Sequence, residues 1–180
     1  MTPLELLEAR IRALEDIQAI TQLKHRYFRF LDQKKWDELR KCFTEDVESA
    51  YEDGHYCFSG IDDVMRFLAE GMEGLSAGGR FALHLGHHPE IELLSEKQAR
   101  GRWTLHAPML DRTEGTVGAY DAFYTDDYRK VENQWLISRI GFEMYTHSSW
   151  PESELQVSHG EEADSREINA AARAAASCQR

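Results

Sequence analysis

The predicted fold centres on residues 24–39, which read KHRYFRFLDQKKWDEL. We interpret this stretch as the end of one long amphipathic helix and the beginning of a second, shorter one. An apolar stripe at helical spacing enters it from the N-terminal side, formed by Ile17, Ile20, Leu23, Tyr27, Phe30 and Leu31. Tyr27 lies near the centre of this stripe, and Asp32 falls towards its edge at the end of the helix.

Tyr27 and Asp32 are the first candidates for chemistry, because an ionisable group is costly to bury unless it is paired or hydrogen-bonded. Asp32 also lies at the negative end of the helix dipole, which disfavours a second negative charge. If it points inward it needs a cationic or hydrogen-bonding partner, and a histidine would suit. The alternative is a solvated Asp32 and a core Tyr27, and the helix taken alone favours that alternative.

The segments on either side of this stretch predict helices and two short strands. Thr2 is suited to cap the first helix and Pro3 to occupy its first position. Glu52-Asp53-Gly54 is a turn signal between the two short strands. The predicted elements are a helix over 3–32, a helix from 34 or 35 to about 42, strands over 47–51 and 55–58, and a helix from about 60 to 71, followed by a glycine-rich loop.

Four long strands are predicted after the helices, separated by short polar turns, over residues 81–94, 99–110, 117–131 and 135–145. Consecutive strands with short connections form an antiparallel meander. Helices followed by a meander define an α+β protein. Long strands beside three helices suggest a strongly bent sheet that closes over a pocket.

Composition and charge limit the function. The 180 residues suggest one main domain over 1–150, followed by a polar tail over 151–180 that is partly helical and partly mobile. A net charge of −11 argues against nucleic acid or an anionic membrane as partner. No apolar run approaches the ~20 residues that span a bilayer. The first residues lack the pattern of a signal peptide, so a cytoplasmic location is expected. The three cysteines show neither zinc spacing nor a disulfide framework.

Histidine is the natural proton-transfer residue near neutral pH, and His84 is the one with small neighbours. Strand alternation places His84 with Ala82, Gly86 and His88 on one face, which could leave room for a ligand. The alternative is an inert His84 on the outer face, since alternation does not tell which face is concave. His84 and His88 would be ~13 Å apart on a strand, too far to share one ion, so no metal is expected.

One face of the strand over 101–109 is apolar and carries Trp103, Leu105, Ala107 and Met109. This face is either a wall for a flat hydrophobic ligand or ordinary core, and core is the safer interpretation for each residue alone. His106 falls on the opposite face. Further phenols are supplied by Tyr51, Tyr120, Tyr124 and Tyr145; most are expected to be packing residues, with Tyr51 the first to test.

With these pieces joined, the chain resembles the SnoaL-like branch of the NTF2-like superfamily, and within it the bacterial bile acid 7α-dehydratases. The resemblance covers about residues 17–145 and also extends to scytalone dehydratase around the helix-end Asp and the strand His. It implies a cone of curved antiparallel sheet with three helices around one deep apolar pocket. The matching stretches are Tyr27-Phe28-Arg29, Leu31-Asp32, Trp36-Asp37-Glu38-Leu39, His84-Leu85-Gly86-His87, Pro89-Glu90-Ile91, Gly101-Arg102-Trp103, Ala122-Phe123-Tyr124-Thr125-Asp126 and Gln134-Trp135.

The resemblance assigns roles residue by residue. The family's catalytic tyrosine, aspartate and histidine fall on Tyr27, Asp32 and His84, and a pocket tyrosine falls on Tyr51. Two positions depart from the family, where a strand carboxylate becomes Ala107 and a last-strand arginine becomes Met144. The expected substrate-binding residues are Tyr51, Trp103, Leu105, Ala107, Met109, Tyr124 and Met144.

The implied activity is a cofactor-independent dehydratase acting on a hydroxylated steroid or similar polycyclic enone. His84 would remove a proton made acidic by a conjugated carbonyl, Tyr27 or Tyr51 would hydrogen-bond the carbonyl oxygen, and Asp32 would orient His84. No metal or organic cofactor is expected. The alternatives are a related isomerase, cyclase or dehydrohalogenase, or a non-catalytic binder of hydrophobic small molecules. A homo-oligomer is expected, with a trimer favoured and a dimer next.

Overall fold

The structure is a computed structural model that describes residues 2–154. Its first compact unit ends at Trp150, and the described part of the second consists of residues 151–154. The elements, in chain order, are α1 (Pro3–Asp32), α2 (Trp36–Arg40), β1 (Phe43–Tyr51), β2 (Tyr56–Ser59), α3 (Ile61–Ala77), β3 (Arg80–Ala82), β4 (Leu85–Leu93), β5 (Gln98–Asp111), β6 (Thr116–Val131), β7 (Gln134–Pro151) and the 3-10 turn η1 (Glu152–Glu154).

The first helix begins and ends where the sequence predicts. The Thr2 hydroxyl accepts a hydrogen bond from the Glu5 backbone N–H, and the Glu5 carboxylate accepts one from the Thr2 backbone N–H at 2.7 Å. This reciprocal arrangement is a capping box, which satisfies two amides that the helix itself leaves free. Pro3 occupies the first turn, where its missing N–H costs nothing.

The buried face of α1 differs in part from the predicted stripe. Phe28 is buried and Phe30 is only half-buried, and the charged residue Lys24 is fully buried. The buried residues of the helix are Ile20, Leu23, Lys24, Tyr27, Phe28 and Leu31. The prediction followed apolar side chains alone, and so it passed over a lysine at the same helical spacing.

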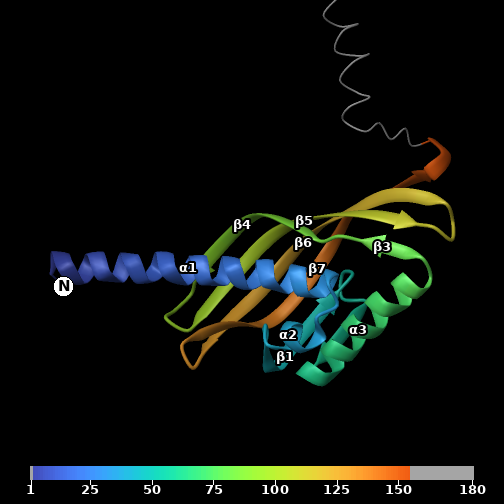
Figure 1. Cartoon of the computed structure of the whole chain (residues 1–180). Coiled ribbons are helices and arrows are strands. Elements are labelled where there is room, and N and C mark those ends of the chain that lie inside the picture. The colour runs from blue at the N-terminus through green and yellow to red at the C-terminus, as the bar shows by residue number, and fades with distance from the viewer. Residues whose placement is uncertain (1, 155–180) are drawn as a thin grey trace, which may run out of the picture. The chain divides into compact units, whose positions relative to one another are not determined.

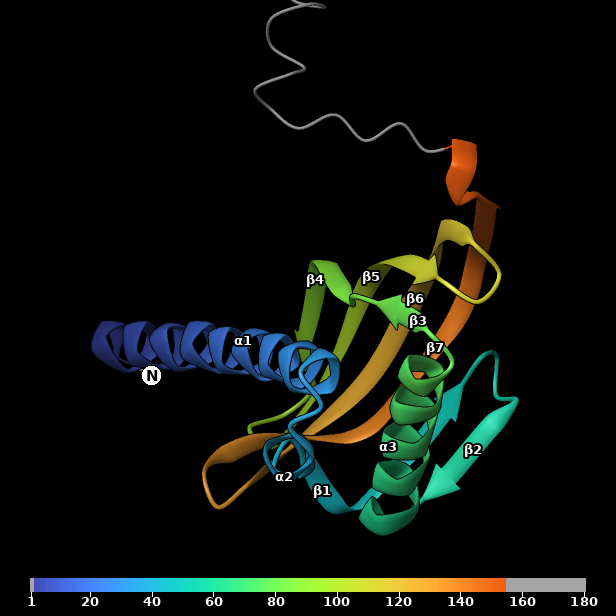
Figure 2. The same ribbon diagram turned by 45° about the vertical axis from the view of Figure 1, so that its right-hand side comes forward.

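The sheet curls around the carboxyl end of α1, with α3 closing its open side (Figures 1 and 2). The strand order is β2-β1-β7-β6-β5-β3, with β4 also paired to β5. The antiparallel pair of β5 and β6 aligns Trp103 with Tyr124 and Ala107 with Tyr120. β1 and β7 are parallel, a non-local pairing that the meander pattern did not predict, so the sheet is mixed.

Several predicted boundaries were wrong. β1 begins at position 43 where 47 was predicted, and β7 ends at position 151 where 145 was predicted. The predicted strand over 81–94 is split into β3 and β4, and His84 lies in the break between them. Strict alternation also fails beyond His87, because His88 has a φ of 51° and the β4–β5 register shifts there. In addition, α3 continues to Ala77, so Gly71 and Gly74 are helical; its apolar face packs on the sheet and offsets their low helix propensity.

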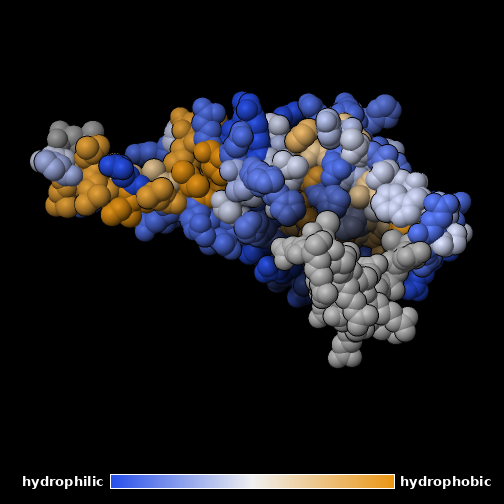
Figure 3. Space-filling view, turned by 90° about the horizontal axis from the view of Figure 1, so that it is seen from above, coloured by the Kyte–Doolittle hydropathy of each residue, from blue (hydrophilic) through white to orange (hydrophobic). Residues whose placement is uncertain are grey.

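The first half of α1 extends beyond the sheet and exposes an apolar stripe of Leu4, Leu7, Ile11 and Leu14 (Figure 3). These side chains are 47–67% exposed. The expected homo-oligomer stays a prediction, which light scattering on the full chain would check. No helix within residues 2–154 is long and apolar enough to cross a membrane. The predicted tail falls outside the described residues from position 155 onward.

Candidate active site

The structure brings Asp32, the last residue of α1, against His84 in the break between β3 and β4. Asp32 Oδ1 lies 2.6 Å from His84 Nδ1, and Asp32 Oδ2 accepts the His84 backbone N–H at 3.1 Å. Both carboxylate oxygens therefore bind the same residue, and both side chains are largely buried. These two contacts fix the orientation of the His84 imidazole ring. Because a carboxylate only accepts hydrogen bonds, Nδ1 carries the proton.

The other ring nitrogen of His84 points into the cone, towards a tyrosine that our sequence analysis did not single out. The Tyr120 hydroxyl lies 3.2 Å from His84 Nε2. With Nδ1 protonated, Nε2 holds a lone pair and accepts a hydrogen bond from the Tyr120 hydroxyl. Burial raises the pKa of Tyr120 to about 12, and the Asp32 and Glu52 carboxylates act in the same direction. Tyr120 is therefore a neutral donor at physiological pH.

Phe28 supports the histidine ring from the side. Its ring stacks on that of His84 with centroids 6.2 Å apart and an interplanar angle of 10°. The ring also fills the space above Gly86, where a Cβ atom would overlap the Phe28 side chain. Gly86, one of the small residues around His84, thus makes room for Phe28.

Gly86→Ala is expected to lower the free energy of unfolding by about 1–3 kcal/mol, because the added methyl group must displace the Phe28 ring. Urea denaturation would measure the loss. Gly71→Ala is the matched control, since its Cβ meets no atom within 4 Å and alanine favours a helix interior by about 0.5–1 kcal/mol. Equal stability of the two variants would contradict the packing role of Phe28.

Two further phenols lie deep inside the cone. The hydroxyls of Tyr27 and Tyr51 are buried and have no hydrogen-bond partner among the described residues. Burial is the main reason that the pKa values of both phenols are raised well above the usual range. Tyr27, Tyr51 and Tyr124 influence one another's pKa through their hydroxyls, so they form a cluster of neutral phenols. Hydrogen bonds of good geometry are not reached at Tyr27 and Tyr51, and a buried donor in that state is costly unless a ligand or water completes it.

A buried ion pair that the sequence analysis missed lies behind these phenols. Lys24 Nζ is 2.7 Å from Asp126 Oδ2, with neither side chain exposed. The ammonium also lies 3.7 Å from the ring centroid of Tyr124. Burial lowers the pKa of Lys24 to about 8, although Asp126 acts in the opposite direction. The available signal was spacing, since Lys24 is four residues after Ile20 and three before Tyr27.

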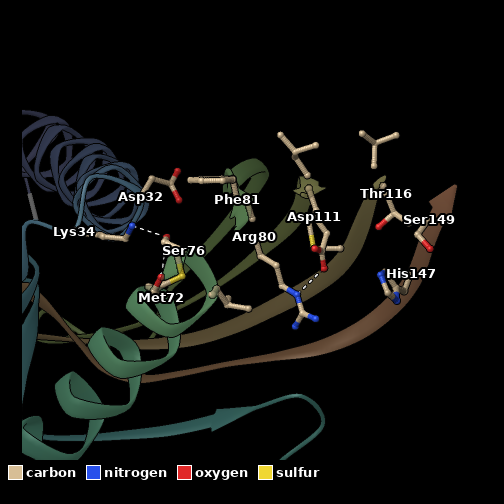
Figure 4. Close-up of a pocket in the computed structure, with 16 residues that line it drawn as sticks. Asp32, Lys34, Met72, Ser76, Arg80, Phe81, Asp111, Thr116, His147 and Ser149 are labelled. Atoms are coloured by element: carbon tan, nitrogen blue, oxygen red, sulfur yellow. Dashed lines mark hydrogen bonds and ion pairs between the residues drawn. The ribbon is translucent and has the colours of Figure 1, made fainter. Parts of the chain in front are cut away.

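Two cavities reach Asp32, and the second of them also reaches His84. The first, which we call the mouth cavity, has a volume of about 430 Å³ and lies between the end of α1, α3 and strands β3, β5, β6 and β7 (Figure 4). Asp32 lines it at the α1 end. The second has a volume of about 440 Å³ and is lined by both Asp32 and His84, together with Phe28 and Gly86. Ligand sites of proteins commonly have volumes in this range.

The expected substrate-binding residues are dispersed. Met109 lines the mouth cavity, and Met144 is 38% exposed. Neither cavity at Asp32 is lined by the other five, which are buried in the core: Tyr51, Trp103, Leu105, Ala107 and Tyr124. Aromatic rings from α1, α3 and β7 pack against Tyr51 and Tyr124 and fill the interior of the cone.

No three histidine, cysteine, aspartate or glutamate side chains gather closely enough to hold a metal ion within residues 2–154. The polar groups at the site are instead a carboxylate, an imidazole and phenols, which suit proton transfer and hydrogen bonding.

Residues 12–141 match the family model of the SnoaL-like domain. The chain belongs to this SnoaL-like family. Its fold is NTF2-like, of the cystatin-like type, as in an NTF2-like protein from Novosphingobium aromaticivorans that is 22% identical, with a TM-score of 0.69 and coverage of 80% of this chain and 91% of the other.

Two other solved structures share this SnoaL-like fold. A scytalone dehydratase candidate from Novosphingobium aromaticivorans is 23% identical, with a TM-score of 0.68 and coverage of 83% of this chain and 93% of the other. A hexachlorocyclohexane dehydrochlorinase, LinA-type3 from Novosphingobium barchaimii, is 15% identical, with a TM-score of 0.72 and coverage of 83% and 99%. At these identities the similarity establishes the fold.

Proposed function

We propose that this protein is a cofactor-independent lyase that eliminates water from a hydroxylated steroid or similar polycyclic enone. The observation that supports this most is the hydrogen-bonded chain from Asp32 through His84 to Tyr120, next to an apolar cavity. A histidine with one nitrogen held by a carboxylate and a lone pair on the other is built to take up a proton.

The proposed reaction uses one base that later acts as an acid. His84 Nε2 removes a proton from a carbon that a conjugated carbonyl has made acidic, and the electron pair moves towards the carbonyl oxygen. The electrons then return to form the alkene as the C–O bond breaks, and His84 transfers its proton to the departing hydroxide to form water. Asp32 stabilises the imidazolium between the two steps, since its carboxylate contacts Nδ1.

The phenols are proposed to bind the carbonyl oxygen. Tyr27 and Tyr51 are neutral donors that make no hydrogen bond of good geometry within the described residues, so an oxygen that gains negative charge would satisfy them. Tyr120 releases Nε2 when substrate binds and donates to a substrate oxygen instead. The rings that fill the cone must shift to admit the substrate.

The experiment that tests this proposal is ultraviolet absorbance after mixing the purified protein with a 7α-hydroxy-3-oxo-4-ene steroid. Elimination extends the enone to a dienone and shifts the absorbance to longer wavelength. An absorbance shift that the wild-type protein produces and that is lost when His84 is substituted supports the proposal. Bound steroid without a shift would reject the elimination, and no binding would reject the steroid as substrate.

A dehydrohalogenase is the second candidate, favoured by two apolar substitutions. Ala107 and Met144 stand where the resemblance expects a carboxylate and an arginine, which leaves no charged group at those positions to bind a hydroxyl. His84 would again remove the proton. Chloride would be the leaving group, and it departs as an anion without being protonated by an acid. Chloride release from hexachlorocyclohexane without dehydration of the steroid would favour this candidate.

Tyr120→Phe is expected to lower kcat about tenfold, the effect of losing one hydrogen bond worth ~1.4 kcal/mol in the transition state. The ring remains, so the free energy of unfolding should change little. Tyr145→Phe is the control, because that side chain is 68% exposed. An unchanged kcat in Tyr120→Phe would remove Tyr120 from the mechanism.

A further inference from the structure

The mouth cavity combines a largely apolar wall with charged groups, of which Asp32 and Lys34 lie at the α1 end and the Arg80–Asp111 pair lies further along (Figure 4). Figure 4 shows Asp32 and Lys34 together at the end of α1, facing Phe81 and α3. The apolar wall is formed by Met72, Leu75, Phe81, Met109, Leu110 and Val117. Such a wall suits the body of a flat hydrophobic molecule, and the polar groups at its end determine how that molecule is oriented.

Lys34 has an unusual backbone conformation. Its φ is 54°, in the left-handed region, at the position just after the end of α1. Glycine is the usual residue there, because it has no Cβ to clash with the backbone. A lysine at this position is strained, and strain of this kind is common where a side chain has a function.

The Lys34 side chain reaches across to α3. Its Nζ donates a hydrogen bond of 2.6 Å to Ser76 Oγ, and that hydroxyl donates in turn to the Met72 carbonyl oxygen at 3.0 Å (Figure 4). Ser76 is neutral, so it orients the half-buried ammonium without cancelling its charge. An ammonium has three donors, and Ser76 takes one of them.

The guanidinium and the two carboxylates that line the cavity are already paired. Arg80 Nε donates to Asp111 Oδ2 at 2.6 Å, and both oxygens of Asp32 are occupied by His84. Among the ion pairs of residues 2–154, none includes Lys34. The α1 end of the cavity therefore presents one ammonium, already oriented, whose charge no carboxylate neutralises.

We propose that the mouth cavity binds a hydrophobic ring compound that bears a carboxylate, and that Lys34 pairs with this carboxylate. The inference rests on the proposed function in taking the ligand of this cavity to be the substrate. A partly buried ammonium gains more from an anionic oxygen than one in bulk water does. Lys34 would thereby determine which end of the substrate lies beside Asp32, the partner of His84.

The test compares 1-naphthoate with its neutral counterpart, 1-naphthamide, by isothermal titration calorimetry. The wild-type protein is expected to bind the carboxylate about tenfold more tightly than the amide, as one charge-assisted hydrogen bond provides. Lys34→Met should abolish this preference and Lys34→Arg should keep it. Lys35→Met is the matched control, because it removes the same charge from an adjacent, exposed residue outside the cavity.

Lys34→Gly separates binding from a structural role. Glycine adopts the left-handed backbone conformation of position 34 without strain, so the Tm of this variant should rise. Its preference for the carboxylate probe over the amide probe should be lost. Equal affinity of the wild-type protein for both probes, no binding of either probe, or an intact preference in Lys34→Met would each overturn the inference. Because binding is measured without turnover, failure of the dehydration assay would reject the proposed function and leave this result unaffected.

Discussion

His84→Gln is expected to reduce kcat/KM for the hydroxy-enone steroid by about 10²–10⁴-fold, the usual contribution of a general base. Glutamine keeps a polar group in a similar volume, but it cannot accept a proton near neutral pH. The expected loss is in kcat, because the apolar wall that binds the steroid body is untouched. Stopped-flow absorbance at the dienone wavelength would measure it.

The control for this variant is a second histidine–aspartate pair on the outer face of the sheet. His106 Nδ1 lies 2.8 Å from Asp121 Oδ1, and both side chains are well exposed. His106→Gln therefore removes the same chemical group from a similar pair that reaches neither cavity at Asp32. Comparable losses of kcat/KM in the two variants would show that replacing either histidine has the same effect, and would argue against His84 as the base.

Lys24→Met is expected to destabilise the protein by about 3–5 kcal/mol, because it leaves the Asp126 carboxylate buried without a cation. Tyr128 still donates to Asp126 at 2.9 Å, which compensates only in part. Burial also raises the pKa of Asp126, and removing the lysine strengthens that shift. Urea denaturation followed by circular dichroism would give the difference in free energy of unfolding.

The double variant Lys24→Met/Asp126→Leu should recover most of this stability, since replacing a buried ion pair by apolar residues is often neutral or stabilising. Lys41→Met is the matched control, because its pair with Glu38 is exposed and should contribute less than about 1 kcal/mol. A loss of less than 1 kcal/mol in Lys24→Met would mean that Asp126 is neutral in the folded protein.

Local sequence signals were sufficient for several elements. The cap of α1 is formed by Thr2, Pro3 and Glu5, neighbours in the chain, so its position could be predicted from their order alone. The alternation in β5 also held, with Trp103, Leu105 and Ala107 buried together. In contrast, the parallel pairing of β1 with β7 and the break at His84 depend on contacts between distant segments.

The candidate active site likewise has features that local sequence signals predict and features that depend on contacts between distant segments. The sequence by itself determined that Asp32 ends a helix and that it needs a cationic or hydrogen-bonding partner if it is buried, because helix spacing and charge burial are local properties. The pairing of Asp32 with His84 was implied by the family resemblance. Only the tertiary structure decided that these two residues meet, that Tyr120 is the phenol at Nε2, and that Lys24 is buried with Asp126. Each of these contacts joins segments that lie far apart in the chain. The distance between such segments is set by packing, which no pattern within one segment encodes.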